Sequence, residues 1–225
     1  DELLGLFVFW EITTVASYLL IGFDDEKAEA RASALQAVLV TTSGGLAMLA
    51  GFVLLAMASG TTRISTIGAD PPTGTMVSVA LVLIFLGAFT KSAQFPFHFW
   101  LPGAMAAPTP ASAYLHSATM VKAGIVLLLL LAPGFATTSL WVWVVTATGL
   151  ITMALGALTA IKQRDLKLLL AYGTVSQLGF MTALIGLGFT AAALAVLVAH
   201  SLFKAALFLI VGIVDKATGT RQIGE

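Results

Sequence analysis

The sequence predicts an all-α protein: a polytopic transmembrane helical bundle with about seven spans and a broken helix near Pro96. Of the 225 residues, 59% are hydrophobic and only 10% are charged, which is far from the composition of a soluble globular domain. Roughly 20 apolar residues in a helix cross a bilayer core of about 30 Å, and about seven windows of the chain qualify. Because unpaired backbone groups are costly in hydrocarbon, we expect these windows to be helices rather than open strands.

The predicted spans are separated by short linkers. In chain order they cover 3–23, 32–58, 76–95, 108–131, 138–160, 166–187 and 190–213. Linkers rich in Asp, Pro and Gly lie between them, for example at 70–72 and at Pro133–Gly134, so we expect one compact bundle over 1–225. The chain opens with Asp1-Glu2 and has neither an initiator Met nor a basic leader there, so we interpret it as a partial domain, a fragment of a longer subunit.

Positive charges predict the orientation of the bundle. The loops after the first, third and fifth spans and the chain end hold most Lys and Arg, and the opposite side has only Arg63. By the positive-inside rule, those loops are expected in the cytoplasm. Trp141 and Trp143 are then expected at the outer interface and Trp100 near the inner one. The cationic residues of the predicted inner side are Lys27, Arg31, Lys162, Arg164, Lys167, Lys216 and Arg221.

Composition also excludes several functions. The net charge is zero, which gives no reason to expect a nucleic-acid partner. The chain has no Cys, so disulfides, thiolate metal sites and cysteine nucleophiles are excluded. Neither a Gly-rich phosphate loop nor a histidine pair at metal-ligand spacing is present. We therefore expect no cofactor, no bound metal and no catalytic site of an enzyme.

Two prolines interrupt the chain between the third and fourth spans. Pro96 and Pro102 lie within the aromatic segment 94–102, where the third helix is predicted to break. Broken helices in membranes are tolerated where their free backbone groups face protein or a wet cavity, and in transporters they often mark the ion site. An ordinary loop at the membrane surface is the alternative interpretation.

Charged side chains inside apolar spans are the strongest functional signal. Glu11, Lys91, Lys122 and Lys204 each cost about 2.5 to 3.5 kcal/mol at a helix centre unless a partner, water or a function offsets the cost. Low dielectric disfavours the charged form of any such group, so a buried lysine can exchange protons near neutral pH. The alternatives are a structural ion pair of Glu11 with a lysine and, for Lys91, snorkelling to the interface.

Histidines extend this polar series. His116 lies in the fourth span, and His200 lies four residues before Lys204, hence on the same helical face. Imidazole titrates near neutral pH and can pass protons in both directions, although a single buried histidine is more often a packing residue. His98, beside the prolines, is expected to be structural. Ser176 and Gln177 in the sixth span are expected to pack against other helices rather than line water.

Several long motifs resemble one known family, the antiporter-like subunits of respiratory complex I and of the Mrp-type cation/proton antiporters. The segments that carry the resemblance are LFVFWE at 6–11, TKSAQFPFHFWLP at 90–102, PTPASAYLHSATMVKAG at 108–124, DLKLLLAYGTVSQLG at 165–179 and HSLFKAALFL at 200–209. Within that family, the segments FPFHFWLP and AYLHSATMVKAG are most similar to the Mrp A subunit.

The resemblance assigns roles to individual residues. Glu11 matches the glutamate of the family's fifth helix, Lys91 the lysine of the broken seventh, and Lys122 the lysine of the eighth. Glu11 and Lys91 would form an ion pair. The residues that match the central hydrated axis, along which protons would move, are His116, Lys167, His200 and Lys204. The family's first four helices and the lysine of its twelfth helix are not in this chain.

The resemblance implies a transporter in the cell membrane. We expect a proton- and cation-translocating subunit of a Na⁺/H⁺ antiporter, with other subunits of a hetero-oligomeric complex, membrane lipid, protons and Na⁺ as partners. A proton-pumping subunit of complex I or of a membrane-bound hydrogenase is the first alternative. A scaffold whose charges only hold subunits together is the second.

Overall fold

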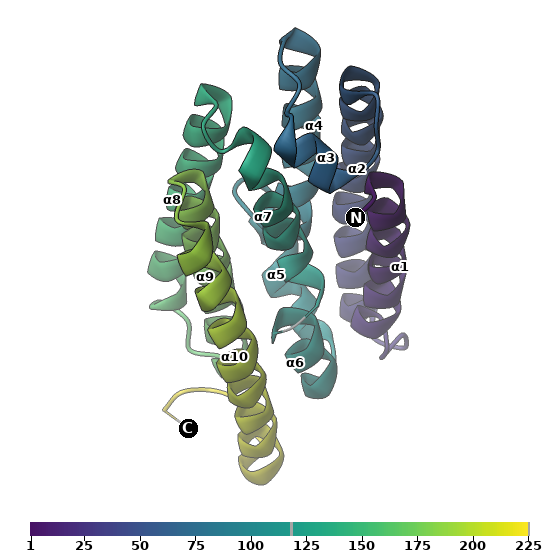
Figure 1. The fold of residues 1–225 in the computed structure, drawn as a ribbon. Coiled ribbons are helices and arrows are strands. Elements are labelled where there is room, and N and C mark those ends of the chain that lie inside the picture. The colour runs from purple at the N-terminus through teal and green to yellow at the C-terminus, as the bar shows by residue number, and fades with distance from the viewer. Residues whose placement is uncertain (118, 225) are drawn as a thin grey trace.

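The protein folds into a bundle of helices. Its structure is a computed structural model that describes residues 1–117 and 119–224. Figure 1 shows α1 and α2 on one flank, α8, α9 and α10 on the other, and α5 to α7 between them. The helices are α1 (Leu3–Ile21), α2 (Ala28–Ser59), α3 (Ile64–Ala69), α4 (Thr75–Lys91), α5 (Trp100–Gly103), α6 (Thr109–Ser117), α7 (Ala123–Phe135), α8 (Ser139–Ala160), α9 (Leu166–Gly186) and α10 (Thr190–Thr218), with 3₁₀ turns η1 (Phe97–Phe99), η2 (Ala104–Ala106) and η3 (Met120–Lys122).

The predicted transmembrane spans are confirmed. Six apolar helical segments within the described residues are long enough to cross a membrane, and α4, with 17 residues, is a shorter seventh. Each one overlaps one of the predicted windows. The short helix α3, between the second and third spans, was not expected from the sequence.

The predicted break near Pro96 is present. Helix α4 ends at Lys91, and the chain continues through Ala93, at a positive φ of 47°, into η1 and α5. Carbonyl groups freed at the end of α4 find new donors: Trp100 Nε1 donates to Thr90 O at 2.9 Å, and the backbone N–H of Gln94 donates to Phe89 O at 2.8 Å. Trp100 and Leu101 are buried. Both ends of the segment are therefore packed inside the bundle, whereas Phe95, Pro96 and Phe99 between them are exposed.

A second interruption lies in the window predicted as one helix over 108–131. Helix α6 ends at Ser117, η3 covers Met120–Lys122, and α7 begins at Ala123. At the other end, α7 continues to Phe135 with Pro133 inside its last turns, so Pro133–Gly134 is helix and not the expected linker. A proline this near a helix end removes one backbone hydrogen bond and is tolerated where packing holds the turn.

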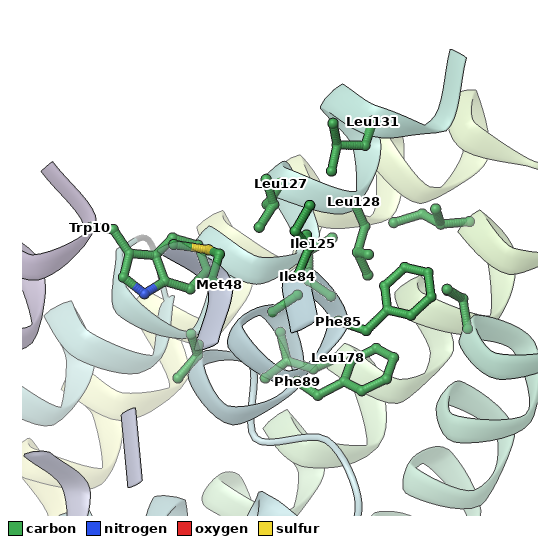
Figure 2. Packing of buried hydrophobic residues seen from close by; sticks show 14 of the residues in the cluster. Trp10, Met48, Ile84, Phe85, Phe89, Ile125, Leu127, Leu128, Leu131 and Leu178 are labelled. Atoms are coloured by element: carbon green, nitrogen blue, oxygen red, sulfur yellow. The ribbon is translucent and has the colours of Figure 1, made fainter. Parts of the chain in front are cut away.

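Large apolar side chains of several helices form the main core. Phe85 of α4 stacks on Phe89 at 5.7 Å between ring centroids and meets Trp141 of α8 edge-on at 5.4 Å. Figure 2 shows Trp10 and Met48 beside this cluster, and Leu127, Leu128 and Leu131 of α7 near it. Trp141 is thus a core residue and not the interface residue that was expected, whereas Trp143 is exposed.

Close packing through glycines joins α8 and α9 into an antiparallel hairpin. Gly149 and Gly156 of α8 and Gly179 and Gly186 of α9 each repeat after seven residues. A Cβ atom at Gly149 would overlap the backbone of Ala183, and one at Gly179 would overlap the backbone of Met153. Small residues that let two backbones approach are the usual device of helix packing in membranes. Ser176 Oγ adds a hydrogen bond to Met153 O at 3.0 Å, which confirms its predicted packing role.

Adding one methyl group to this interface is expected to destabilise the fold. Gly149→Ala forces the methyl group against the Ala183 backbone, so the cost is about 1–3 kcal/mol, as for overpacked cores. The measurement is the thermal unfolding midpoint of the detergent-solubilised protein. Gly68→Ala in α3 is the matched control, because a Cβ atom there has its nearest neighbour at 3.7 Å. Equal midpoints for the two variants would contradict the close packing.

Candidate functional site

Lys91 is held by the first helix. It lies at the end of α4 with no exposed surface, and its Nζ donates to Trp10 O at 2.9 Å and to Thr14 Oγ1 at 2.6 Å. The ammonium also lies 5.2 Å from the centroid of the Trp10 ring, within range of a cation–π interaction. Lys91 therefore does not snorkel to the interface.

Glu11 follows Trp10 in α1, on the turn that binds Lys91. It does not form the expected direct ion pair with Lys91. Within the described residues, the ion pairs closer than 4.0 Å involve other side chains. Glu11 and Lys91 are still electrostatic neighbours. Glu11 Oε1 is buried without a hydrogen-bond partner in that part of the chain, and a Cβ atom at Gly45 of α2 would overlap it. Lys91 is therefore bound by two neutral acceptors on α1 and not by the Glu11 carboxylate.

Lys122 lies at the second helix interruption. Its Nζ donates to Ser117 O, at the end of α6, and to Ser201 Oγ of α10 at 2.6 Å. The carbonyl of Ser117 is available because α6 ends there. The break between α6 and α7 was not predicted from the sequence, whereas Lys122 was. This break supplies a hydrogen-bond acceptor for Lys122.

Lys204 and Lys167 are likewise bound by carbonyl groups. Lys204 Nζ donates to Leu170 O of α9 at 3.1 Å. Lys167 Nζ donates to Met105 O at 3.1 Å and to Ala107 O at 2.7 Å, in the segment that follows the broken helix. Both side chains are at most 5% exposed.

Two of the carbonyls that bind a lysine also accept a hydrogen bond from a threonine four residues later in the same helix. Thr14 Oγ1 donates to Trp10 O at 3.2 Å, and Thr174 Oγ1 donates to Leu170 O at 2.8 Å. In each case the same carbonyl also accepts a lysine ammonium. Back-bonding of this kind often bends a helix, and each of these carbonyls accepts the threonine hydroxyl together with the lysine.

Two fully buried histidines lie between the lysines. His116 packs on Phe208 of α10, with ring centroids 5.6 Å apart, and His200 meets Phe203 edge-on at 5.1 Å. Both ring nitrogens of each histidine have no hydrogen-bond partner in the described part of the protein. Buried polar groups are almost always paired with protein or water, so these four nitrogens are an exception among the described residues.

Electrostatic proximity orders these residues into a row. His116 is the neighbour of Lys167 and Lys204, and His200 is the neighbour of Lys204 and Lys122. The order is therefore Lys167, His116, Lys204, His200 and Lys122. We call these five residues the lysine–histidine row. Glu11 and Lys91 form a second group on the α1–α4 side of the bundle, and His98, which stacks on Phe95, belongs to neither.

The arrangement suits proton movement. The four buried lysines are bound by carbonyls and hydroxyls, and none of the described carboxylates forms a salt bridge with them. A lysine held by neutral acceptors can lose its proton without leaving a paired carboxylate uncompensated. Sequence reasoning missed Thr14, Ser117 and Ser201 as partners. The only available signal for Thr14 was its position three residues after Glu11 on an apolar helix.

Comparison with known proteins identifies the family. The family model described as "NADH:quinone oxidoreductase/Mrp antiporter, TM" matches residues 1–225. The chain belongs to this family and is a multi-pass membrane protein.

Curated relatives with high identity are antiporter subunits. The chain is 51% identical to the A/B subunit of a probable K⁺/H⁺ antiporter of Rhizobium meliloti, and the match covers 99% of this chain and 23% of the relative. It is 46% identical to the A1 subunit of a Na⁺/H⁺ antiporter of Staphylococcus saprophyticus, over 99% of this chain and 30% of the relative. The chain thus spans less than a third of the length of these relatives.

Two solved structures share the fold. A chain in the structure of the Mrp complex from Dietzia sp. superposes with a TM-score of 0.94 at 46% identity, over 100% of this chain and 25% of that one. A chain of the membrane-bound sulfane sulfur reductase, an archaeal respiratory membrane complex, superposes with a TM-score of 0.87 at 25% identity, over 99% and 47% of the two chains. The resemblance read from the sequence is confirmed.

Replacing a row histidine by leucine is expected to leave the fold stable. His116→Leu removes an imidazole without hydrogen-bond partners among the described residues, so the thermal midpoint should stay the same or rise. Thr152→Val is the control, because it removes the acceptor of the Phe95 N–H at 2.9 Å and should cost about 1–3 kcal/mol. A larger loss for His116→Leu than for Thr152→Val would mean that the imidazole has a structural partner.

Proposed function

We propose that this chain is part of the A subunit of an Mrp-type antiporter that exchanges a monovalent cation for protons. We further propose that Glu11, Lys91 and the lysine–histidine row carry the protons. The observation that supports this most strongly is the set of four buried lysines on neutral acceptors, with two histidines between them that have no hydrogen-bond partner among residues 1–117 and 119–224. A scaffold role would favour closed ion pairs or apolar packing at these positions.

In the proposed mechanism, protons move along the row through bound water. An ammonium of the row donates its proton to a neighbouring imidazole nitrogen, and that imidazole passes a proton on to the next lysine. The ends of the row are Lys167 and Lys122. Coupling to Glu11 and Lys91 is electrostatic, since a change of charge at Lys91 acts on its neighbours strongly in a medium of low dielectric.

The proposed cation is Na⁺, and the proposed partners are the other subunits of a hetero-oligomeric antiporter complex in the cell membrane. The names of the relatives support both Na⁺ and K⁺, because one is called a K⁺/H⁺ and the other a Na⁺/H⁺ antiporter subunit. The exchange assay below is therefore run with each ion.

Removal of the charge at the end of the row is expected to abolish exchange. Lys122→Met keeps most of the side-chain volume but removes the titratable group, so Na⁺- or K⁺-driven proton movement in everted vesicles should fall roughly tenfold or more. Lys162→Met, in the exposed turn after α8, is the control and should exchange normally. Unchanged exchange by an assembled Lys122→Met complex would remove the row from the mechanism.

A second prediction concerns the carboxylate of Glu11. Glu11→Gln is nearly isosteric but cannot ionise, so we expect a loss of exchange similar to that of Lys122→Met because the charge that acts on Lys91 is gone. Glu26→Gln, in the exposed loop after α1, is the matched control. Retained exchange in Glu11→Gln would leave only a structural role for this carboxylate.

The second candidate is a proton pump driven by electron transfer in a respiratory complex. The similarity to a chain of the archaeal sulfane sulfur reductase complex favours it. The vesicle assay separates the two, because an antiporter exchanges ions on an imposed Na⁺ or K⁺ gradient alone, whereas a redox pump requires an electron donor.

A further inference from the structure

A polar cavity opens at the end of the bundle that holds most of the cationic loops. It has a volume of about 590 Å³ and is lined by the α1–α2 loop, the segment after the broken helix, the start of α9 and the end of the chain. Lys167, the end of the lysine–histidine row, is among its lining residues. We call this cavity the vestibule. The other charged residues that line it are Asp24, Lys27, Glu29, Asp165, Asp215 and Arg221.

The chain end folds back to place Arg221 in this vestibule. Helix α10 ends at Thr218 and is followed by Gly219, whose φ of 75° lets the chain reverse. The backbone N–H of Leu166 then donates to Arg221 O at 3.0 Å, and the N–H of Ile223 donates to Arg164 O at 2.8 Å. The position of Arg221 is therefore fixed by backbone pairing and not by its side chain alone.

The Arg221 side chain is paired with two carboxylates. Its Nε lies 3.3 Å from Asp165 Oδ2 and 4.0 Å from Asp215 Oδ2. The other oxygen of Asp165 caps α9, because Oδ1 accepts from the backbone N–H of Lys167 at 2.7 Å and of Leu168 at 3.1 Å. One carboxylate thus links Arg221 directly to the helical turn that carries Lys167.

Arg221 is a cation that acts on Lys167 at the vestibule. The guanidinium is charged at every accessible pH. The carboxylates of Asp165 and Asp215 oppose it, and Asp24 is paired with Lys27 at 2.9 Å on the α1–α2 loop. On the buried side, Lys167 faces His116 of α6. A fixed cation that lines a polar cavity changes the local potential and hence the local concentration of small cations.

We propose that Arg221 is an electrostatic gate, a positioning residue at the mouth of a water-accessible vestibule through which Lys167 exchanges protons with this side of the membrane. The gate rests on the proposed function, since it has a role only if Lys167 carries protons. Without Arg221, the carboxylates of Asp165 and Asp215 are left unneutralised and hold cations at the mouth.

Charged thiol reagents measure this potential without any transport assay. These 225 residues contain no Cys, so a single Ala106→Cys in the vestibule lining introduces a thiol where they have none, and the cysteine-free parent complex or its Cys-substituted form gives the background rate. The modification rates of this thiol are compared for a cationic and an anionic membrane-impermeant methanethiosulfonate of similar size. We expect Arg221→Gln to raise the ratio of cationic to anionic rate by at least about threefold at low salt, and less at high salt.

Matched variants separate charge from structure. Arg164→Gln removes the same charge from the neighbouring turn between α8 and α9, which does not place Arg164 in the vestibule lining, so the rate ratio should stay unchanged. Arg221→Lys should keep the ratio close to that of the parent. An unreactive Ala106→Cys in the assembled complex, or equal ratios for Arg221→Gln and Arg164→Gln, would overturn the gate.

Exchange in everted vesicles tests whether the gate serves the row. Arg221→Gln is expected to slow exchange about threefold or more, while Arg221→Lys and Arg164→Gln exchange like the parent. A changed rate ratio with unchanged exchange would overturn the gate while leaving the row in place. Failure of the proposed function itself would appear differently, as normal exchange in Lys122→Met.

Discussion

Each buried lysine ammonium needs hydrogen-bond acceptors, and the positions of the helix ends in this structure depend on that need. In hydrocarbon an unpaired lysine is costly, and each of the four buried lysines is bound by at least one backbone carbonyl. Most helical carbonyls are already engaged, and the backbone acceptors used here lie either where a helix ends or where a threonine one turn later binds the same carbonyl. The ends of α6 and η2 supply the first kind, and Trp10 and Leu170 supply the second. Helix breaks and lysines are therefore parts of one arrangement.

Neutral acceptors distinguish this arrangement from a set of ion pairs. A salt bridge would tie the protonation of a lysine to one carboxylate and resist its loss. Lys91 illustrates the difference, because it lies near Glu11 yet binds Trp10 O and Thr14 Oγ1. The carboxylate acts on the lysine from a distance, so a change of charge on either group alters the energy of the other without first breaking a contact.

Hydropathy predicted the spans well, because length and apolar composition are all that a membrane crossing requires. The prolines at 96 and 102 predicted the first helix break. The second break, before Lys122, has no proline or glycine to mark it, and the window read as one continuous helix. The helical Pro133 and the buried Trp141 were misjudged because local rules for linkers and interfaces ignore which neighbours a residue packs against. The lysines and histidines could be named from sequence, but their acceptors are set by contacts between distant segments, as with Lys122 and Ser201.

The glycine-packed hairpin of α8 and α9 has a mechanical consequence. Backbones in direct contact leave little room for sliding, so this pair is a stiff unit. It carries Lys167 and the Leu170 carbonyl at one edge, whereas Ser201 and Lys204 belong to α10, a longer helix with much of its surface exposed. A shift of α10 by a fraction of a helical turn would stretch the Lys204–Leu170 and Lys122–Ser201 contacts together while the hairpin stayed in place. Helix α10 thus makes one lysine contact with the hairpin, through Lys204 and Leu170, and one with η3, through Ser201 and Lys122, so its position affects both lysines at once.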